Sequence, residues 1–200
     1  MHTIKHILEK FSNDPRIDVF PPDSPLPTLP NFLSYPPDLA EFYKLCGGAQ
    51  LFSPKNDSIS FTILPPQQIK QSNTEIVGTP CDDDISSSWY LICKTDNNDY
   101  ISIDLSIERS GRCYDSNFEI HGVAGSCPII ALSFKELLVS IYTSDGDDIF
   151  GETEIMEMLT TKSKHYKANQ PPLHHEQNKH LSLEDRSKKW PDIYVICSFS

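Results

Sequence analysis

The sequence predicts an α+β domain, in which a curved antiparallel sheet carries helices on one face. Three observations lead to this fold class. Apolar stripes with helical spacing lie near both ends of the folded part, over 4–11 and 134–141. A third amphipathic helix, over 37–46, ends at a Gly-Gly pair. Between 59 and 124, short segments alternate apolar with polar residues, as half-buried strands do.

The first helix is predicted over residues 3–11, because its apolar residues share one helical face. These residues are Ile4, Ile7, Leu8 and Phe11. Asn13-Asp14-Pro15 then ends the helix. The segment 20–37 follows, and its seven prolines exclude both a helix and a central strand.

This proline-rich segment is expected to lie extended across the surface, in a polyproline-like conformation. Its apolar residues would hold it against the protein; they are Leu26, Leu29, Phe32 and Leu33. The alternative is that the segment serves as a proline-rich ligand for another protein.

The central helix opens at Pro36-Pro37, because proline lacks the N–H that the first turn would leave unpaired. Asp38 in that turn suits the positive end of the helix. One face is apolar through Leu39, Phe42, Tyr43 and Cys46. Gly47-Gly48 is expected to end the helix in a left-handed cap.

Strands are predicted over 59–63, 75–77, 89–94, 100–105, 111–115 and 119–124. The apolar run 89–94 is expected to be a central strand. The polar turn at 95–99 joins it to the next strand as an antiparallel hairpin. Between the first two strands, Pro65-Pro66 opens a helical turn that runs to Ser72.

The last helix of the sheet region begins at Ser133, which forms a capping box with Glu136. Its buried stripe would be Phe134, Leu137, Leu138 and Ile141. A short helix over 152–160 completes a domain of residues 1–160. Residues 161–200 are predicted to be a polar tail or linker, ending in an edge strand over 190–199. That strand could pair with its own sheet or with a neighbour, so we expect a monomer or a weak homodimer.

The net charge of −11 is confined to the first three quarters of the chain. Residues 1–150 hold 10 Lys or Arg against 21 Asp or Glu, whereas residues 151–200 hold seven of each. Such a surface disfavours nucleic acid and anionic membranes and attracts a basic partner. Solubility alone is the alternative explanation.

The protein is expected in the cytoplasm, because the sequence has no apolar run long enough to span a bilayer and no secretory signal. Its six cysteines form no CxxC pair and should be reduced. Trp89 is expected in the core; if exposed, it would be a natural binding residue.

No catalytic motif is present: the sequence has no GxSxG, P-loop, HExxH or GxGxxG. The histidines 174, 175 and 180 lie in the predicted tail, where no fold would hold a metal. Asp145-Gly146-Asp147-Asp148 lacks the spacing of an EF-hand loop. Asp82-Asp83-Asp84 is expected to form an exposed acidic patch, although a cation site or an acid/base role is the alternative. We therefore expect no enzyme, no metal and no cofactor.

The order and spacing of these motifs over residues 1–142 resemble the SUKH superfamily, that is, the Smi/Knr-type domain. The matching positions are Pro37, Asp38, Phe42, Tyr43, Gly47, Gly48, Trp89, Asp104, Tyr114 and Phe134. The sequence departs from the family pattern at Cys46, where a polar residue such as Asn is usual. The tail after residue 160 has no counterpart.

The resemblance implies a protein that binds another protein and catalyses no reaction. Bacterial members of the superfamily are immunity proteins that neutralise polymorphic or contact-dependent toxins, often nucleases. The cognate toxin domain would be basic and would meet acidic residues of this chain. We expect these to include Asp82, Asp83, Asp84, Glu108, Asp115 and Asp145.

Two other functions stay open at this point. Relatives in fungal cell-wall synthesis imply a regulatory scaffold or peptide-binding module, which would use the sheet edge or the proline-rich segment. A small hydrolase or metal-dependent enzyme using the Asp and His residues is the third hypothesis, although no nucleophile, base and orienting group can be named together.

Overall fold

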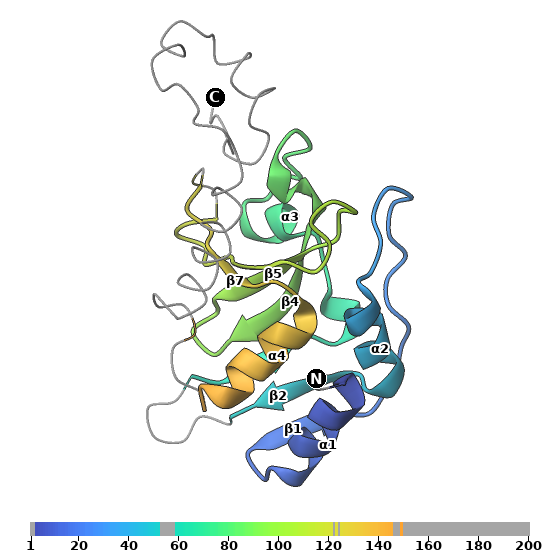
Figure 1. Cartoon of the computed structure of the whole chain (residues 1–200). Coiled ribbons are helices and arrows are strands. Elements are labelled where there is room, and N and C mark those ends of the chain that lie inside the picture. Colours follow the sequence, from blue (N-terminus) through green and yellow to red (C-terminus); the bar gives the residue numbers. More distant parts are fainter. Residues whose placement is uncertain (1–2, 53–58, 122, 124, 146–148, 150–200) are drawn as a thin grey trace, which may run out of the picture.

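An antiparallel sheet organises the chain, and each of its seven strands pairs with the next one in the sequence. The computed structural model describes residues 3–52, 59–121, 123, 125–145 and 149 (Figure 1). The strands in these ranges are β1 (Ile17–Phe20), β2 (Gly48–Leu51), β3 (Phe61–Ile63), β4 (Trp89–Thr95), β5 (Tyr100–Asp104), β6 (Cys113–Asp115) and β7 (Ile129–Ala131). The sheet is open, with β1 and β7 at its edges and β4 in the middle.

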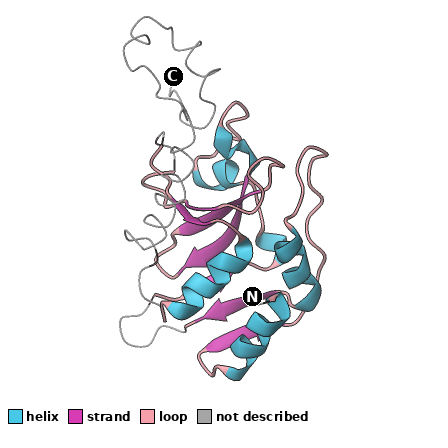
Figure 2. Ribbon diagram, viewed as in Figure 1, coloured by secondary structure: helices cyan, strands magenta, loops and turns pink. Residues whose placement is uncertain are grey.

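The helices of the described ranges are α1 (Ile4–Asn13), α2 (Pro37–Leu45), α3 (Ser72–Ile76) and α4 (Phe134–Thr143). Two short 3-10 turns, η1 (Pro66–Gln68) and η2 (Ile85–Ser88), precede α3 and β4. Figure 2 shows α1, α2 and α4 on the same face of the sheet. This arrangement is the predicted α+β fold.

The core lies between the sheet and these three helices. All four residues of the α1 stripe are buried, and so are the four of α4. In α2, Leu39, Phe42 and Tyr43 are buried, and Cys46 just beyond its end is buried too. The ring of Phe42 packs edge-on against Phe134 of α4, with centroids 5.1 Å apart. The predicted helical stripes are therefore confirmed.

The opposite face of the sheet is covered in part by α3 and η2. Strand β5 shows the alternation: Ile101 and Ile103 belong to the main core, and Ser102 between them points the other way. The Ser102 hydroxyl lies 2.8 Å from that of Ser72 at the start of α3. A second, smaller layer therefore stands behind β4 and β5, opposite the three long helices.

The capping box of α4 is present. The Ser133 hydroxyl accepts a hydrogen bond from the Glu136 N–H at 3.1 Å, and the Glu136 carboxylate accepts one from Leu132 N–H at 3.1 Å. The backbone N–H bound by Glu136 is thus one residue earlier than a standard box would have it. The Ser133 bond satisfies a donor that the first turn of the helix leaves free, and the Glu136 bond satisfies the N–H of the residue before the cap.

The Gly-Gly pair after α2 works differently from the expected left-handed cap. The cap residue Cys46 is extended, and Gly48 is already the first residue of β2, with φ +127°. Gly47 is needed because the backbone approaches closely: a Cβ there would lie 2.3 Å from the Pro21 carbonyl oxygen. The glycines let α2 turn directly into a strand beside β1.

Two of the predicted strands are not strands among the residues that the structure describes. The segment 75–77 is not a strand: Glu75 and Ile76 are helical in α3, whose start is capped by the Gln71 side chain. The segment 119–124 has no strand among its described residues, because Asn117 and Ile120 accept successive turn bonds. The structure also forms β1, β2 and β7, which lie outside the predicted strand ranges.

The proline-rich segment is extended and held to the protein. Leu26, Leu29 and Leu33 pack against the core, and Leu33 forms an isolated bridge with Ser106. Phe32 is 70% exposed, so its expected role as an anchor was wrong. The predictions for 152–160 and for 161–200, with its three histidines and its edge strand, lie outside the described residues.

Candidate functional site

The acidic residues predicted to bind a partner do not form one exposed patch. Asp82 and Asp83 are exposed in the loop before η2, and Glu108 is exposed in the turn between β5 and β6. None of these three forms an ion pair within the described ranges. They are the members of the set that can meet a partner directly.

Asp84 and Asp115 are each only 8% exposed, so the expectation of an accessible carboxylate was wrong for both. Asp84 caps η2, where its Oδ1 accepts hydrogen bonds from the Ser86 N–H at 2.8 Å and hydroxyl at 2.7 Å. Asp115 accepts a bond from the Asn117 N–H at 3.0 Å. Both carboxylates hold their own loops in place.

Asp145 is exposed but paired. Its carboxylate binds the Arg16 guanidinium, which also holds Asp14 at 2.8 Å. Arg16 directly precedes β1, the edge strand, so Asp145 joins the end of α4 to that edge. It therefore lies at a different part of the sheet from the loop that leads into β4.

Asp104 is fully buried at the end of β5 and accepts four hydrogen bonds. Its Oδ1 accepts from the Ser88 hydroxyl and the Ser106 N–H, each at 2.8 Å. Its Oδ2 accepts from the Trp89 indole at 3.2 Å and from the Arg109 Nε at 2.7 Å. A buried carboxylate needs such a set of donors to offset the loss of hydration.

Trp89 is buried, as expected, with 4% of its surface exposed. Its indole stacks on the Tyr114 ring with centroids 3.9 Å apart and planes inclined by 19°. The two residues come from β4 and β6, which both flank β5. Burial raises the pKa of Tyr114, and nearby Asp104 adds to this, while Arg112 acts in the opposite direction.

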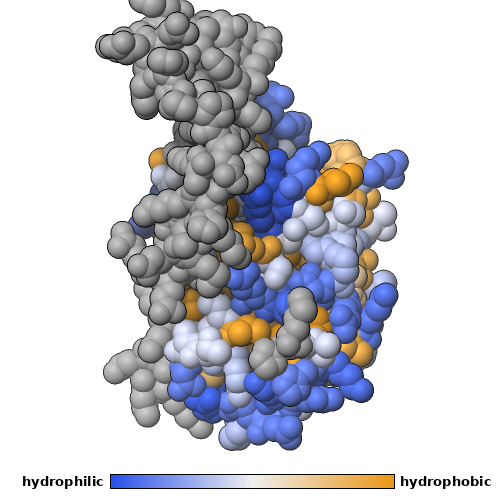
Figure 3. All heavy atoms as spheres, in the orientation of Figure 1, coloured by the Kyte–Doolittle hydropathy of each residue, from blue (hydrophilic) through white to orange (hydrophobic). Residues whose placement is uncertain are grey.

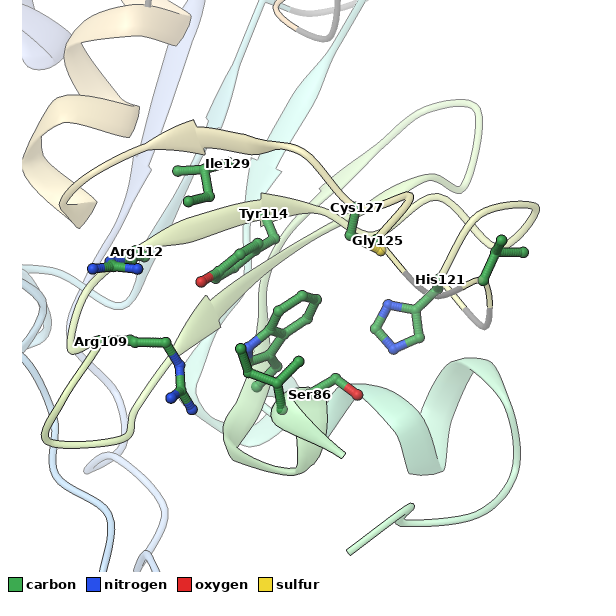
Figure 4. A pocket seen from close by; sticks show the side chains of 11 residues that line it. Ser86, Arg109, Arg112, Tyr114, His121, Gly125, Cys127 and Ile129 are labelled. Atoms are coloured by element: carbon green, nitrogen blue, oxygen red, sulfur yellow. The ribbon is translucent and has the colours of Figure 1, made fainter. Parts of the chain in front are cut away.

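This aromatic pair forms one wall of a pocket of about 230 Å³, here named the Trp89 pocket. Its principal lining residues are Ile85, Trp89, Arg109, Arg112, Tyr114, His121 and Ile129. Figure 4 shows the two arginines together at one end and His121 at the other. The pocket thus has a cationic end, an aromatic wall and an imidazole opposite the cations.

His121 is buried beside the indole, with ring centroids 6.0 Å apart. Its Nε2 lies 2.8 Å from the Asn73 Oδ1 of α3, and its Nδ1 has no hydrogen-bond partner among the described residues. Burial lowers the pKa of His121 to about 4, although the negative charge of Asp84 opposes this shift. The ring is therefore neutral at pH 7.

Four of the five cysteines in the described part of the chain are poor nucleophiles, because burial keeps their thiols protonated. Burial raises the pKa of Cys127, which lines the pocket, to about 12 and that of Cys46 to about 11. The pKa values of Cys93 and Cys113 are raised by burial as well. These thiols are protonated at neutral pH and behave as small apolar groups.

Within the same ranges, no three His, Cys, Asp or Glu side chains gather closely enough to hold a metal ion. None of the helices there combines the length and apolar character that a membrane span requires.

Sequence reasoning missed Arg109, Arg112 and His121. One signal was available: Arg109 and Arg112 are two of only three basic residues in 101–150, a stretch rich in acids. No pattern marked His121, because its neighbours in the pocket come from other strands.

Residues 32–140 match the family model described as SMI1 / KNR4 family (SUKH-1). The match covers more than half of the chain, and the chain belongs to this family. It is also similar to the Immunity protein YokJ of Bacillus subtilis (strain 168), with 35% identity over 144 residues. That alignment covers 72% of this chain and 86% of the relative. No solved structure matches the chain.

Proposed function

We propose that this chain is an immunity protein that neutralises a toxin by binding it stoichiometrically. The observation that carries this proposal is the 35% identity to an immunity protein over 86% of that protein's length. Membership of the SMI1 / KNR4 family is consistent with it.

The toxin domain is proposed to be basic, with a nuclease as one possible activity. An enzyme that acts on nucleic acid needs positive charge to approach its substrate, and this charge complements a chain of net charge −11. The exposed carboxylates of Asp82, Asp83 and Glu108 would steer the encounter. Complementary charge mainly raises the association rate and favours the correct partner.

The direct test uses the gene encoded beside that of this chain. If it specifies a large secreted protein with a variable C-terminal domain, that domain is expressed from an inducible promoter with and without the full chain. We expect growth arrest without the chain, full rescue with it, and a 1:1 complex by light scattering. Continued arrest in the presence of soluble, folded chain would refute the proposal for that toxin.

A second candidate is a regulatory scaffold or peptide-binding module of the SMI1 / KNR4 type. Exposed apolar residues on the described surface favour it: Phe32 is 70% exposed and Ile107 is 72% exposed. The antiparallel bridge between Leu33 and Ser106 joins the two segments that carry Phe32 and Ile107. Purified chain that binds several unrelated proteins with similar affinity, and no adjacent toxin, would support this function instead.

A further inference from the structure

The cationic end of the Trp89 pocket has one more positive charge than its own contacts balance. The Arg109 Nε–H donates a hydrogen bond to the buried carboxylate of Asp104 at 2.7 Å. Arg112 has no carboxylate partner within the described ranges. This end of the pocket therefore holds two guanidinium groups, of which only Arg109 is paired with a carboxylate among the described residues, and a second acidic group would complete the arrangement.

The opposite end contains a buried polar atom that is not satisfied. His121 is 5% exposed, and its Nδ1 has no hydrogen-bond partner among the described residues. The Asn73 amide, assigned with its Nδ2 donating to the Pro80 carbonyl, offers its Oδ1 to Nε2, so Nε2 carries the proton. Nδ1 is then an acceptor that lacks a donor, which is unfavourable for a buried group.

The space between these ends suits a small group. A cavity of about 230 Å³ is below the roughly 300–1,000 Å³ of sites for drug-sized ligands. Its wall is the Trp89–Tyr114 stack, which favours a short apolar stem. Asp84 near His121 disfavours an anion at that end, so an acidic group belongs beside the arginines.

We propose that the Trp89 pocket binds a carboxylate carried on a short apolar stem. Arg112 receives the carboxylate, and Nδ1 of His121 receives an N–H or O–H donor of the same ligand. An aspartate or glutamate within a peptide supplies all three features, because its backbone N–H lies close to its side chain. A free small carboxylic acid with a hydroxyl or amide group is the other source of this chemistry.

The apolar residues near the arginines favour a protein as the source. Ile107 lies in the same turn as Arg109, and the bridge between Leu33 and Ser106 joins this turn to the segment that carries the exposed Phe32. Exposed aromatic and aliphatic residues beside a pocket are typical of interfaces with a buried anchor side chain. The carboxylate chemistry stands without the proposed function, whereas naming the toxin as its source rests on that function.

The test is NMR titration of the full-length ¹⁵N-labelled chain, with Trp190→Phe to leave Trp89 as the sole indole. The probes are acetyl-Asp-amide, its neutral analogue acetyl-Asn-amide, and mandelate as a free hydroxy acid. We expect acetyl-Asp-amide to shift the Trp89 indole signal with a dissociation constant of about 1 mM. The Asn analogue should bind at least tenfold more weakly.

Three variants assign the binding. Arg112→Gln should weaken the Asp probe at least tenfold, and Arg112→Lys should weaken it less because the charge is kept. Lys44→Gln removes one positive charge from an exposed position on α2 and should change nothing. Thermal unfolding of each variant establishes that it is folded.

Three results would overturn the carboxylate site. The Asp and Asn probes could bind equally well, the Trp89 indole signal could stay unshifted up to about 50 mM probe, or Arg112→Gln could bind the Asp probe as well as the parent does. Tighter binding of mandelate than of acetyl-Asp-amide would keep the site and assign it to a small acid. The growth-rescue experiment separates the two proposals. If the probe binds but the chain does not rescue growth, the carboxylate site stands and the immunity function is refuted for that toxin. If the chain rescues growth but no probe binds, the immunity function stands and the carboxylate site is refuted.

Discussion

Asp104 is the residue on which the second layer of the molecule depends most. It joins η2, β4 and the turn before β6 through one fully buried carboxylate. A buried ionic group of this kind adds little net stability compared with an apolar replacement, but removing one partner leaves the others uncompensated. It fixes the orientation of the Trp89 indole and of Arg109, which both line the pocket.

Replacing Asp104 with alanine should lower the free energy of unfolding by about 3–5 kcal/mol, because four donors lose their acceptor inside the protein. Asp104→Asn should lower the free energy of unfolding by less, because the amide oxygen can still accept hydrogen bonds. Urea denaturation measures both. Asp82→Ala, at an exposed position, is the control and should stay within about 0.5 kcal/mol of the parent. Equal effects at the two positions would contradict this account.

His121 should make stability depend on pH. Burial lowers its pKa to about 4, against 6.5 in the unfolded chain. Between these values only the unfolded state takes up the proton, so the free energy of unfolding falls as the pH drops from 6.5 to 4. The loss should be about 2 kcal/mol at pH 4.5.

The measurement is urea denaturation of the parent and of His121→Asn at pH 7 and pH 4.5. The variant lacks the titrating ring but keeps Asp84 and the other carboxylates near the pocket, so their contributions cancel in the comparison. A smaller loss in the variant is expected; identical losses would show that His121 is not the group responsible.

At the scale of elements, the junctions between helices and strands set the arrangement. Gly47 donates its N–H to the Phe20 carbonyl at 2.8 Å and passes the Pro21 carbonyl without room for a side chain. Asp38 at the start of α2 accepts a bond from the Lys135 N–H of α4 at 2.8 Å. Both contacts tie α2 to segments far away in the sequence.

Gly47→Ala should destabilise the protein by more than about 2 kcal/mol, because the new Cβ would lie 2.3 Å from the Pro21 carbonyl oxygen, a backbone atom that cannot move aside easily. Gly78→Ala is the matched control: nothing lies within 4 Å of its Cβ, and only the strain of φ +86° applies, about 1 kcal/mol. Thermal unfolding compares the two. A smaller effect at Gly47 than at Gly78 would be contrary to the structure.

Asp38→Ala should cost about 1–2 kcal/mol, because the first turn of α4 loses a charged acceptor as well as an interhelical contact. Asp38→Asn should cost about half as much, since the oxygen remains and the charge does not. Glu41→Ala, exposed on the same helix, serves as the reference. Chemical denaturation gives the three values, and an order in which Glu41→Ala costs most would refute the capping role.

At the scale of the whole molecule, the net negative charge is the property that acts on a partner at the longest range. The face in Figure 3 is mostly hydrophilic, and its hydrophobic residues are scattered over it. The net charge of −11 gives the chain a long-range attraction for a basic partner. Such steering weakens as salt shortens the range of the field.

Reversing Asp82, Asp83 and Glu108 to lysine should therefore slow association with the toxin domain at least tenfold at about 20 mM salt, and much less at about 500 mM. The control reverses Glu9, Asp18 and Glu41, which are also exposed but lie on α1, β1 and α2. It changes the net charge equally. Stopped-flow kinetics would contradict the assignment if both triple variants were slowed to the same extent.

Local periodicity predicted much of this fold. The helices α1, α2 and α4 have apolar stripes, and the β4–β5 hairpin has an apolar run, a polar turn and an alternating strand. The strands β1, β2 and β7 lay outside the predicted ranges, because each is short and lacks a clear alternation: β1 lies between prolines, β2 begins within the Gly-Gly pair, and β7 is an apolar run of three residues. At such lengths the pairing partner decides the conformation, and no repeat is long enough to reveal it.

The candidate site was far less predictable. Trp89 and Asp104 were noted as motif positions, but nothing in the sequence related them to Arg109, Arg112 or His121. Nothing in the sequence around Asp84 and Asp115 distinguishes them from exposed aspartates in loops. Only the structure reveals that they are buried. Burial depends on which segments pack together, and that is a property of the folded chain.

The sequence by itself determined the fold class, the three long helices with their buried faces, the central hairpin and the acidic surface. Each of these depends on spacing or composition within one segment, which periodicity and charge record directly. Only the tertiary structure decided which carboxylates are accessible, why Gly47 is glycine, and that two arginines and a buried histidine face one pocket. The reason is physical: sheet pairing brings residues from separate strands and loops within a few ångströms of each other, and a single sequence carries no record of those pairings.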